Sequence, residues 1–194
     1  MGVLQQKDVL FLNVAGGRLV NKKRQVSAPG YEGRLVGIRR TERVWEGQII
    51  PTIEIRMVDG NEMAIIQFNA ESFYATGFAD KIRRVDLSKP FSIGAYGSKT
   101  NDKISYCSFI QFGNNIKFEE GVPQPTDVIV GKKTVKDWTD FNLFFDNVLE
   151  GVVTDLSNVE DLDQINKGTA PRTDKVEQTA EPTESSVDED EIPF

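Results

Sequence analysis

Arginine and aromatic side chains recur together in the first half of this sequence. A guanidinium group binds phosphate or carboxylate through a planar fork of donors, and a flat aromatic ring stacks on another flat ring. Placed side by side on a folded surface, the two groups suit a partner that carries both phosphates and rings. The residues that we expect to make such contacts are Arg34, Arg39, Arg40, Arg43, Trp45, Arg56, Tyr96, Lys99 and Phe109.

The composition excludes several classes of enzyme. The chain has 194 residues, with no histidine and a single cysteine, Cys107. Zinc sites built from His and Cys, and Ser–His or Cys–His nucleophile pairs, therefore cannot form. Residues 94–100 contain the glycines and the lysine of a phosphate-binding loop, but their spacing is wrong and no helical pattern follows. We predict no catalytic residue, metal or cofactor; a magnesium nuclease that uses carboxylates is the enzymatic alternative.

Charge divides the chain into two unequal parts. The net charge of the whole chain is −7, which by itself argues against a nucleic-acid partner. Residues 1–118 nevertheless hold 17 basic and 11 acidic side chains, a net charge of +6. Residues 119–194 hold 6 basic and 19 acidic side chains, a net charge of −13. The basic part contains the arginines named above, so this is the part that we expect to meet phosphates.

Alternating apolar residues predict a mainly β fold. In residues 49–58, Ile53, Ile55 and Met57 lie on one face and Arg56 on the other, as in a strand with one buried face. The predicted strands are Gly33–Trp45, Ile49–Val58, Met63–Phe68, Phe91–Ser98 and Ile104–Phe112, with one helix within Asn69–Val85.

Three strands, one helix and two strands form the element order of an OB-fold, a five-stranded Greek-key barrel that often holds oligonucleotides. Ahead of these elements, a hairpin at about Asp8–Arg24 turns at Gly16-Gly17, and we expect it to be an accessory element. Residues 1–125 are therefore expected to form one domain. Beyond it, residues 126–157 are predicted to be a helical extension, and residues 158–194 a disordered acidic tail.

The same alternation indicates which rings point outward. Tyr96 lies on the strand face opposite to its apolar neighbours, so it should be exposed. In the last strand, we expect Phe109 on the exposed face and Tyr106 in the core. Trp45 lies in or near the loop between the first two strands, where it either stacks on a base or plugs the end of the barrel.

The helical extension is predicted from its capping and its apolar stripe. Residues 134–137 match a capping box, which would open a helix that runs to about Leu156. The stripe recurs at helical spacing, and it either packs on the barrel or joins two subunits. Its members are Trp138, Phe141, Phe145, Val148 and Val152.

The final residues have a composition that solubility does not require. Four consecutive acids precede Ile-Pro-Phe and a free carboxylate, so a partner with a small apolar pocket, a cation and a basic rim would bind this end selectively. The end is similar to the tip of bacterial single-stranded DNA-binding proteins, which close with acids followed by Ile-Pro-Phe or Leu-Pro-Phe. The resemblance covers Asp188, Glu189, Asp190, Glu191, Ile192, Pro193 and Phe194.

This resemblance implies an OB-fold core, a disordered linker and a tip that recruits enzymes of replication, recombination and repair. With the arginines and rings, it leads us to expect sequence-independent binding of single-stranded DNA in a bacterial cytoplasm or an infected host cell. The extra hairpin, the late helix and the glutamates of the tip suggest a divergent or bacteriophage version. An OB-fold adaptor that binds only proteins is the alternative, and RNA binding and self-association stay open. No membrane association is expected.

A second expectation concerns the tail and the basic domain. Because their charges are opposite, the tail should cover the basic surface when no DNA is bound.

Overall fold

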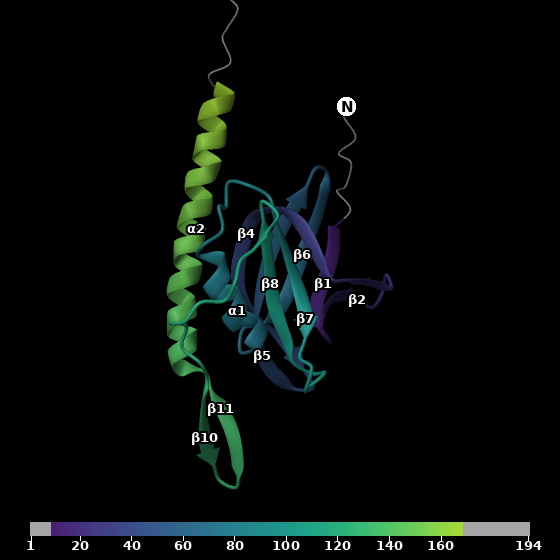
Figure 1. The fold of residues 1–194 in the computed structure, drawn as a ribbon, viewed down its shortest axis with the longest axis vertical. Coiled ribbons are helices and arrows are strands. Elements are labelled where there is room, and N and C mark those ends of the chain that lie inside the picture. The colour runs from purple at the N-terminus through teal and green to yellow at the C-terminus, as the bar shows by residue number, and fades with distance from the viewer. Residues whose placement is uncertain (1–8, 169–194) are drawn as a thin grey trace, which may run out of the picture.

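The computed structural model describes residues 9–168, with side chains as far as residue 158. Its elements are β1 (Val9–Ala15), β2 (Arg18–Asn21), β3 (Val26–Ala28), β4 (Gly30–Trp45), β5 (Gln48–Asp59), β6 (Glu62–Asn69), α1 (Phe73–Ile82), β7 (Phe91–Gly97), β8 (Ser105–Gln111), β9 (Asn114–Asn115), β10 (Thr126–Val130), β11 (Lys133–Asp137) and α2 (Thr139–Gly168). Figure 1 shows a curled sheet with α1 and the long α2 on one side of it. No helix in the described part of the chain is long and apolar enough to cross a membrane.

The body of the protein is a mixed nine-stranded sheet with the order β3-β2-β1-β6-β5-β4-β7-β8-β9. The sheet curls because the long β4 has two partners: its first residues pair with β7, and the rest pair with β5. All five predicted strands and the helix between the third and fourth of them are confirmed. The turns at Glu46-Gly47 and Gly60 take positive φ values, as hairpin turns of this kind require.

The N-terminal hairpin is confirmed, and it is joined to the main sheet. Its first strand, β1, pairs in parallel with β6 from Val9 opposite Met63 to Asn13 opposite Gln67. The hairpin therefore covers an edge of β6 that would otherwise expose unpaired backbone groups. Gly17 lies in the turn of this hairpin, with φ +71°. It is so close to β7 that a Cβ atom on it would be 2.1 Å from the backbone nitrogen of Gly97.

The core lies between the inner face of the sheet and the two helices. Ile53, Ile55 and Met57 are completely buried, as their alternation predicted. The hydroxyl of Ser72 caps α1 by accepting the N–H of Ala75 at 3.2 Å. A Cβ atom on Gly77 would lie 3.3 Å from that of Cys107, so glycine allows α1 to pack closely on β8.

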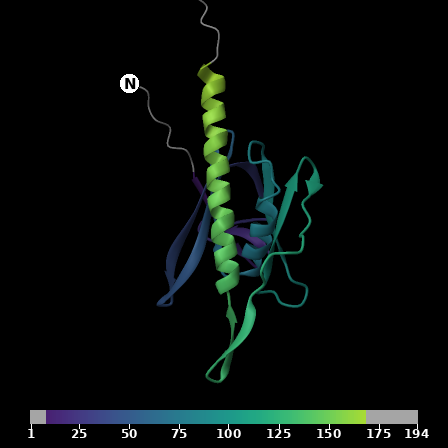
Figure 2. The same cartoon turned by 90° about the vertical axis from the view of Figure 1, so that its left-hand side faces the viewer.

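The helical extension begins later and ends later than predicted. Residues 133–137 form β11, paired with β10, so the capping box at Thr134 is wrong. The helix begins at Thr139, whose N–H and hydroxyl both donate to Oδ1 of Asp137. It continues to Gly168, so residues 158–168, predicted as disordered tail, are helical. Residues 126–137 instead form a hairpin that projects from the body (Figures 1 and 2).

The apolar stripe of α2 packs on its own domain. Phe141 and Phe145 are fully buried, with Phe145 in an edge contact with Phe78 of α1 at 6.1 Å between ring centres. Arg40 of β4 donates to the side chain of Asn142 on the same helix at 2.9 Å. Of the two interpretations of the stripe, packing on the body of the same chain is therefore confirmed, here on the curled sheet and α1.

Candidate nucleic-acid interface

Most of the predicted contact residues of β4 and β5 share one face of the sheet. The odd-numbered residues Ile53, Ile55 and Met57 of β5 are buried, so its even-numbered residues point outward. Residues that are paired across two strands lie on the same face, and Arg39, for example, is paired with Glu54. The outward surface formed in this way, which we call the arginine face, contains Arg34, Arg39, Arg43, Trp45 and Arg56.

A β-bulge makes this common face possible. Within β4, Arg34 has an even number, whereas Arg39, Arg43 and Trp45 have odd numbers, so strict alternation would place Arg34 on the opposite side. The register between β4 and β5 shifts between Leu35 and Gly37, and the extra residue reverses the alternation at that point. Both halves of β4 therefore present their arginines to the same side.

A carboxylate orients two of these arginines. Oε1 of Glu54 lies 2.8 Å from the guanidinium of Arg39 and 3.3 Å from that of Arg56, while Oε2 accepts a hydrogen bond from Gln67 at 3.1 Å. Burial favours the neutral acid, but the hydrogen bonds from Arg39 and Gln67 and the Arg39 charge outweigh it and lower the pKa of Glu54. The ionised Glu54 carboxylate thus fixes the positions of Arg39 and Arg56. Together the three side chains carry a net charge of +1.

Two exposed rings accompany the arginines. Trp45 is 61% exposed at the end of the β4–β5 hairpin. Phe11 of β1 is 51% exposed, and it shares a cross-strand row with Ile65 and Arg56. We did not predict Phe11 because the hairpin was treated as an accessory. The alternation of Leu10 and Leu12 around it was the available signal, since it places Phe11 on the outer side of a strand.

A shallow groove leads from the arginine face toward Tyr96. The outward face of β4 continues onto the neighbouring strand β7, because Gly30 is paired with Gly94 and Glu32 with Ser92. These residues line the groove together with Ser108 of β8. Tyr96, 52% exposed as predicted, follows Gly94 on the same face of β7. Its ring lies 5.5 Å from that of Tyr106, and the exposed Lys99 follows in the next loop.

Two predicted contact residues lie elsewhere. Phe109 is completely buried and stacks on Phe91 at 5.3 Å between ring centres, so its predicted exposure is wrong. The inward residues of β8 are Cys107, Phe109 and Gln111, because α1 packs against that side. Tyr106 correspondingly points outward and is only partly buried, not a core residue as predicted.

Arg40 is the second displaced residue. It is paired with Ile53, whose side chain is in the core, so it leaves β4 on the side opposite to Arg39. Its guanidinium contacts α2, at 2.9 Å from Asn142 and 3.3 Å from Asp146. We therefore remove Arg40 from the candidate interface and assign it to the packing of α2 on the sheet.

Cys107 should be chemically inert in the folded protein. Burial raises the pKa of its thiol to about 12, although the charge of Lys81 opposes this rise. At pH 8 only about one thiol in ten thousand is then ionised, and the thiolate is the reactive form. We expect a colorimetric disulfide reagent to titrate no thiol in the native protein and one after denaturation. Rapid native reaction would contradict the buried position.

Comparison with protein-family models, with curated proteins and with solved structures gives no significant match for this chain. Within the part of the chain described above, no group of three or more Asp, Glu or Cys side chains is arranged to hold a metal ion. The predicted partner-binding tip, residues 188–194, lies outside the described residues. Within the described residues, the features that bear on function are the arginine face, the groove and the exposed rings.

Proposed function

We propose that this protein binds single-stranded DNA without sequence preference on the arginine face, and that it has no catalytic activity. The observation that carries the proposal is the common orientation of four arginines and two exposed rings, Trp45 and Phe11, on one face of a curled sheet. Arginines would contact the phosphates and the rings would stack on bases, which is how proteins hold unpaired strands of any sequence. An unpaired strand is favoured over a duplex because only its bases are free to stack.

The topology supports an OB-fold as the scaffold. The strands β4, β5 and β6, then α1, then β7 and β8 follow the order of its five strands and one helix. In this proposal, the N-terminal hairpin enlarges the barrel by adding β1 beside β6. The enlargement would widen the binding surface, because it brings Phe11 beside the arginines.

The terminal residues have a separate role in this proposal. The four acidic residues 188–191 and Ile192-Pro193-Phe194 recruit proteins of replication, recombination and repair, while the folded domain binds the DNA.

The direct test is a gel-shift series with a single strand, a duplex and RNA, each at two salt concentrations. We expect the single DNA strand to bind most tightly, and its affinity to fall as salt rises. Absence of any shift with single-stranded DNA at low salt would overturn the proposal and favour a protein adaptor. A preference for RNA would leave the arginine face as the binding surface but identify RNA as its ligand.

Single arginine variants give a quantitative prediction. Each phosphate contact on a single strand contributes about −0.7 to the slope of log affinity against log salt. Arg43→Gln and Arg56→Gln should each make the slope less negative by about 0.7, since each would remove one such contact. Arg40→Gln is the matched control, because Arg40 contacts α2. Equal slopes for all three variants would exclude the arginine face as the phosphate-binding surface.

A further inference from the structure

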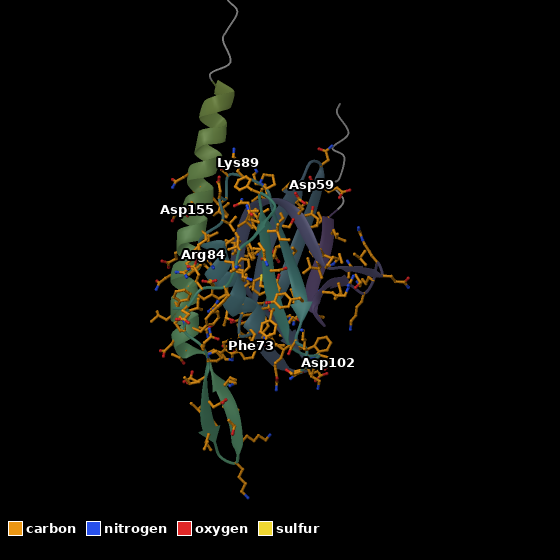
Figure 3. All side chains as sticks on the ribbon, in the orientation of Figure 1. Asp59, Phe73, Arg84, Lys89, Asp102 and Asp155 are labelled. Carbon is orange, nitrogen blue, oxygen red and sulfur yellow. The ribbon has the colours of Figure 1, made fainter. Side chains whose placement is uncertain are left out.

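A second feature of the molecule, separate from the arginine face, is a cavity of about 370 Å³ between α1, β8 and the segment that follows β9. Phe73 and Gly77 of α1 line one side, Tyr96 and Tyr106 line another, and Phe118 closes it from the segment that follows β9. Figure 3 shows Phe73 near the end of the sheet that carries Asp102, in the β7–β8 loop. The volume is in the range of small-ligand sites. Four aromatic rings therefore surround a space of ligand size.

One wall of this cavity contains a buried charge. Lys81 lies on α1, is only 4% exposed, and donates from Nζ to the carbonyl oxygen of Cys107 at 2.6 Å. An ammonium group has three donors, and within the described residues Nζ makes no second hydrogen bond. The neighbouring Asp80 does not supply one, since its carboxylate binds Arg83 and Arg84. Burial accordingly lowers the pKa of Lys81.

A buried ammonium with unused donors can bind an acceptor oxygen that a ligand brings into the cavity. Leaving such donors unpaired away from water is unfavourable, and a ligand that supplies an oxygen would remove that cost. The surrounding rings add a requirement for a flat molecule, because ring faces stack on other rings. Tyr96 and Phe118 are about half exposed, so a ring can approach them from solvent.

We propose that this cavity is a subsite for one nucleobase of the bound DNA strand, in which the Lys81 ammonium donates to a carbonyl oxygen of the base. The inference rests on the proposed function, and the groove over Gly94 lies on the outward face of β4 and β7 between Arg34 and Tyr96, which lines the cavity. Thymine and guanine carry a suitable oxygen in the major-groove position, O4 and O6 respectively, whereas adenine carries none. The subsite therefore favours a thymine over an adenine.

The test compares oligo-dT with oligo-dA of equal length and at one salt concentration, using the full chain and its Lys81→Met variant. Methionine keeps most of the side-chain length and removes the donors. We expect Lys81→Met to weaken oligo-dT binding about tenfold, as a lost hydrogen bond to a charged donor would, and oligo-dA binding less than about twofold. The change in the dT:dA ratio is the readout, because adenine runs also stack on themselves. An equal change for both strands, or no change, would overturn the subsite.

Further arms keep the outcome interpretable. If Lys81→Met does not fold, as judged by circular dichroism, Phe118→Ala replaces it, since Phe118 is about half exposed at the mouth of the cavity. That variant should weaken oligo-dT binding about tenfold through the lost stacking, and unchanged affinity would overturn the subsite. If the effect of Lys81→Met disappears in a Phe194→Ala background, the occupant is the chain terminus and the nucleobase assignment is wrong. Wild-type protein that binds neither strand would instead refute the proposed function itself.

Discussion

Replacing Trp45 by alanine should weaken binding of an oligo-dT strand roughly 5- to 150-fold, which corresponds to a loss of about 1–3 kcal/mol for one base–aromatic stack. The ring is 61% exposed at the end of the β4–β5 hairpin and makes no ring–ring contact within the described residues. The substitution should therefore leave the free energy of unfolding almost unchanged. Affinity is measured by fluorescence anisotropy of a labelled oligo-dT strand.

A matched control is available on another part of the surface. Phe112 is 72% exposed in the turn after β8, away from the β4–β5 hairpin, so Phe112→Ala should not alter affinity by more than about twofold. Addition of oligo-dT should also quench the fluorescence of wild-type protein, which has two tryptophans, more strongly than that of Trp45→Ala. Unchanged affinity of a folded Trp45→Ala protein would remove Trp45 from the interface.

The second large effect concerns stability. Phe145→Ala should lower the free energy of unfolding by about 3–5 kcal/mol, because a fully buried ring is replaced by a cavity between α2, α1 and the sheet. The measurement is denaturation by urea followed by circular dichroism. The loss is large beside the usual stability of a domain, about 5–15 kcal/mol, so partial unfolding at 37 °C is expected.

Leu143 is the control for this variant on the same helix. It lies two residues away and is 68% exposed, so Leu143→Ala should change stability by less than about 0.5 kcal/mol. Similar small effects for both variants would show that α2 does not pack on the sheet as described. A large effect for Leu143→Ala alone would indicate that its exposed side is covered in solution, as in the alternative of a contact between subunits.

The strands of the body could be predicted because their information is local. Alternation identified the buried residues of β5, and glycine-containing turns marked the ends of the β4–β5 and β5–β6 hairpins. The cap of α1 is also a local feature, since the Ser72 hydroxyl satisfies an N–H three residues later. These features depend on residues that are close in the sequence.

The failures arise where distant segments decide the outcome. Phe109 and Tyr106 both fit either face of a strand, and only the packing of α1 on β8 selects Phe109 for the core. Gln111 lies on the same face of β8 as Phe109, and a polar residue there makes that face look exposed in the sequence. In the structure Gln111 is buried, because its side-chain amide forms hydrogen bonds with the backbone of Asp86. The parallel pairing of β1 with β6 is likewise non-local, so the sequence of the hairpin does not predict which strand it joins.

In the candidate site, too, some features follow from the local sequence and others depend on distant segments. Arg39, Arg43 and Trp45 alternate within one strand, so their common face follows from the sequence. Arg34 joins them only because of the bulge after Leu35. Arg40 follows Arg39 in the same strand, so alternation places it on the opposite face, where it contacts Asn142 and Asp146 of α2. The hairpin at residues 126–137 was mistaken for part of a helix because Thr134 and Asp137 imitate a capping box.

The most direct test of the arginine face is ultraviolet cross-linking of the full protein to oligo-dT, with the linked residues identified by mass spectrometry. Bases that stack on Trp45 and Phe11 should link to these two residues, on β4 and β1. Excess unlabelled single strand should abolish both cross-links, whereas an equal amount of duplex should not. Cross-links confined to α2 or to the β10–β11 hairpin, with none on β1 or β4, would contradict the assignment of this face to the DNA.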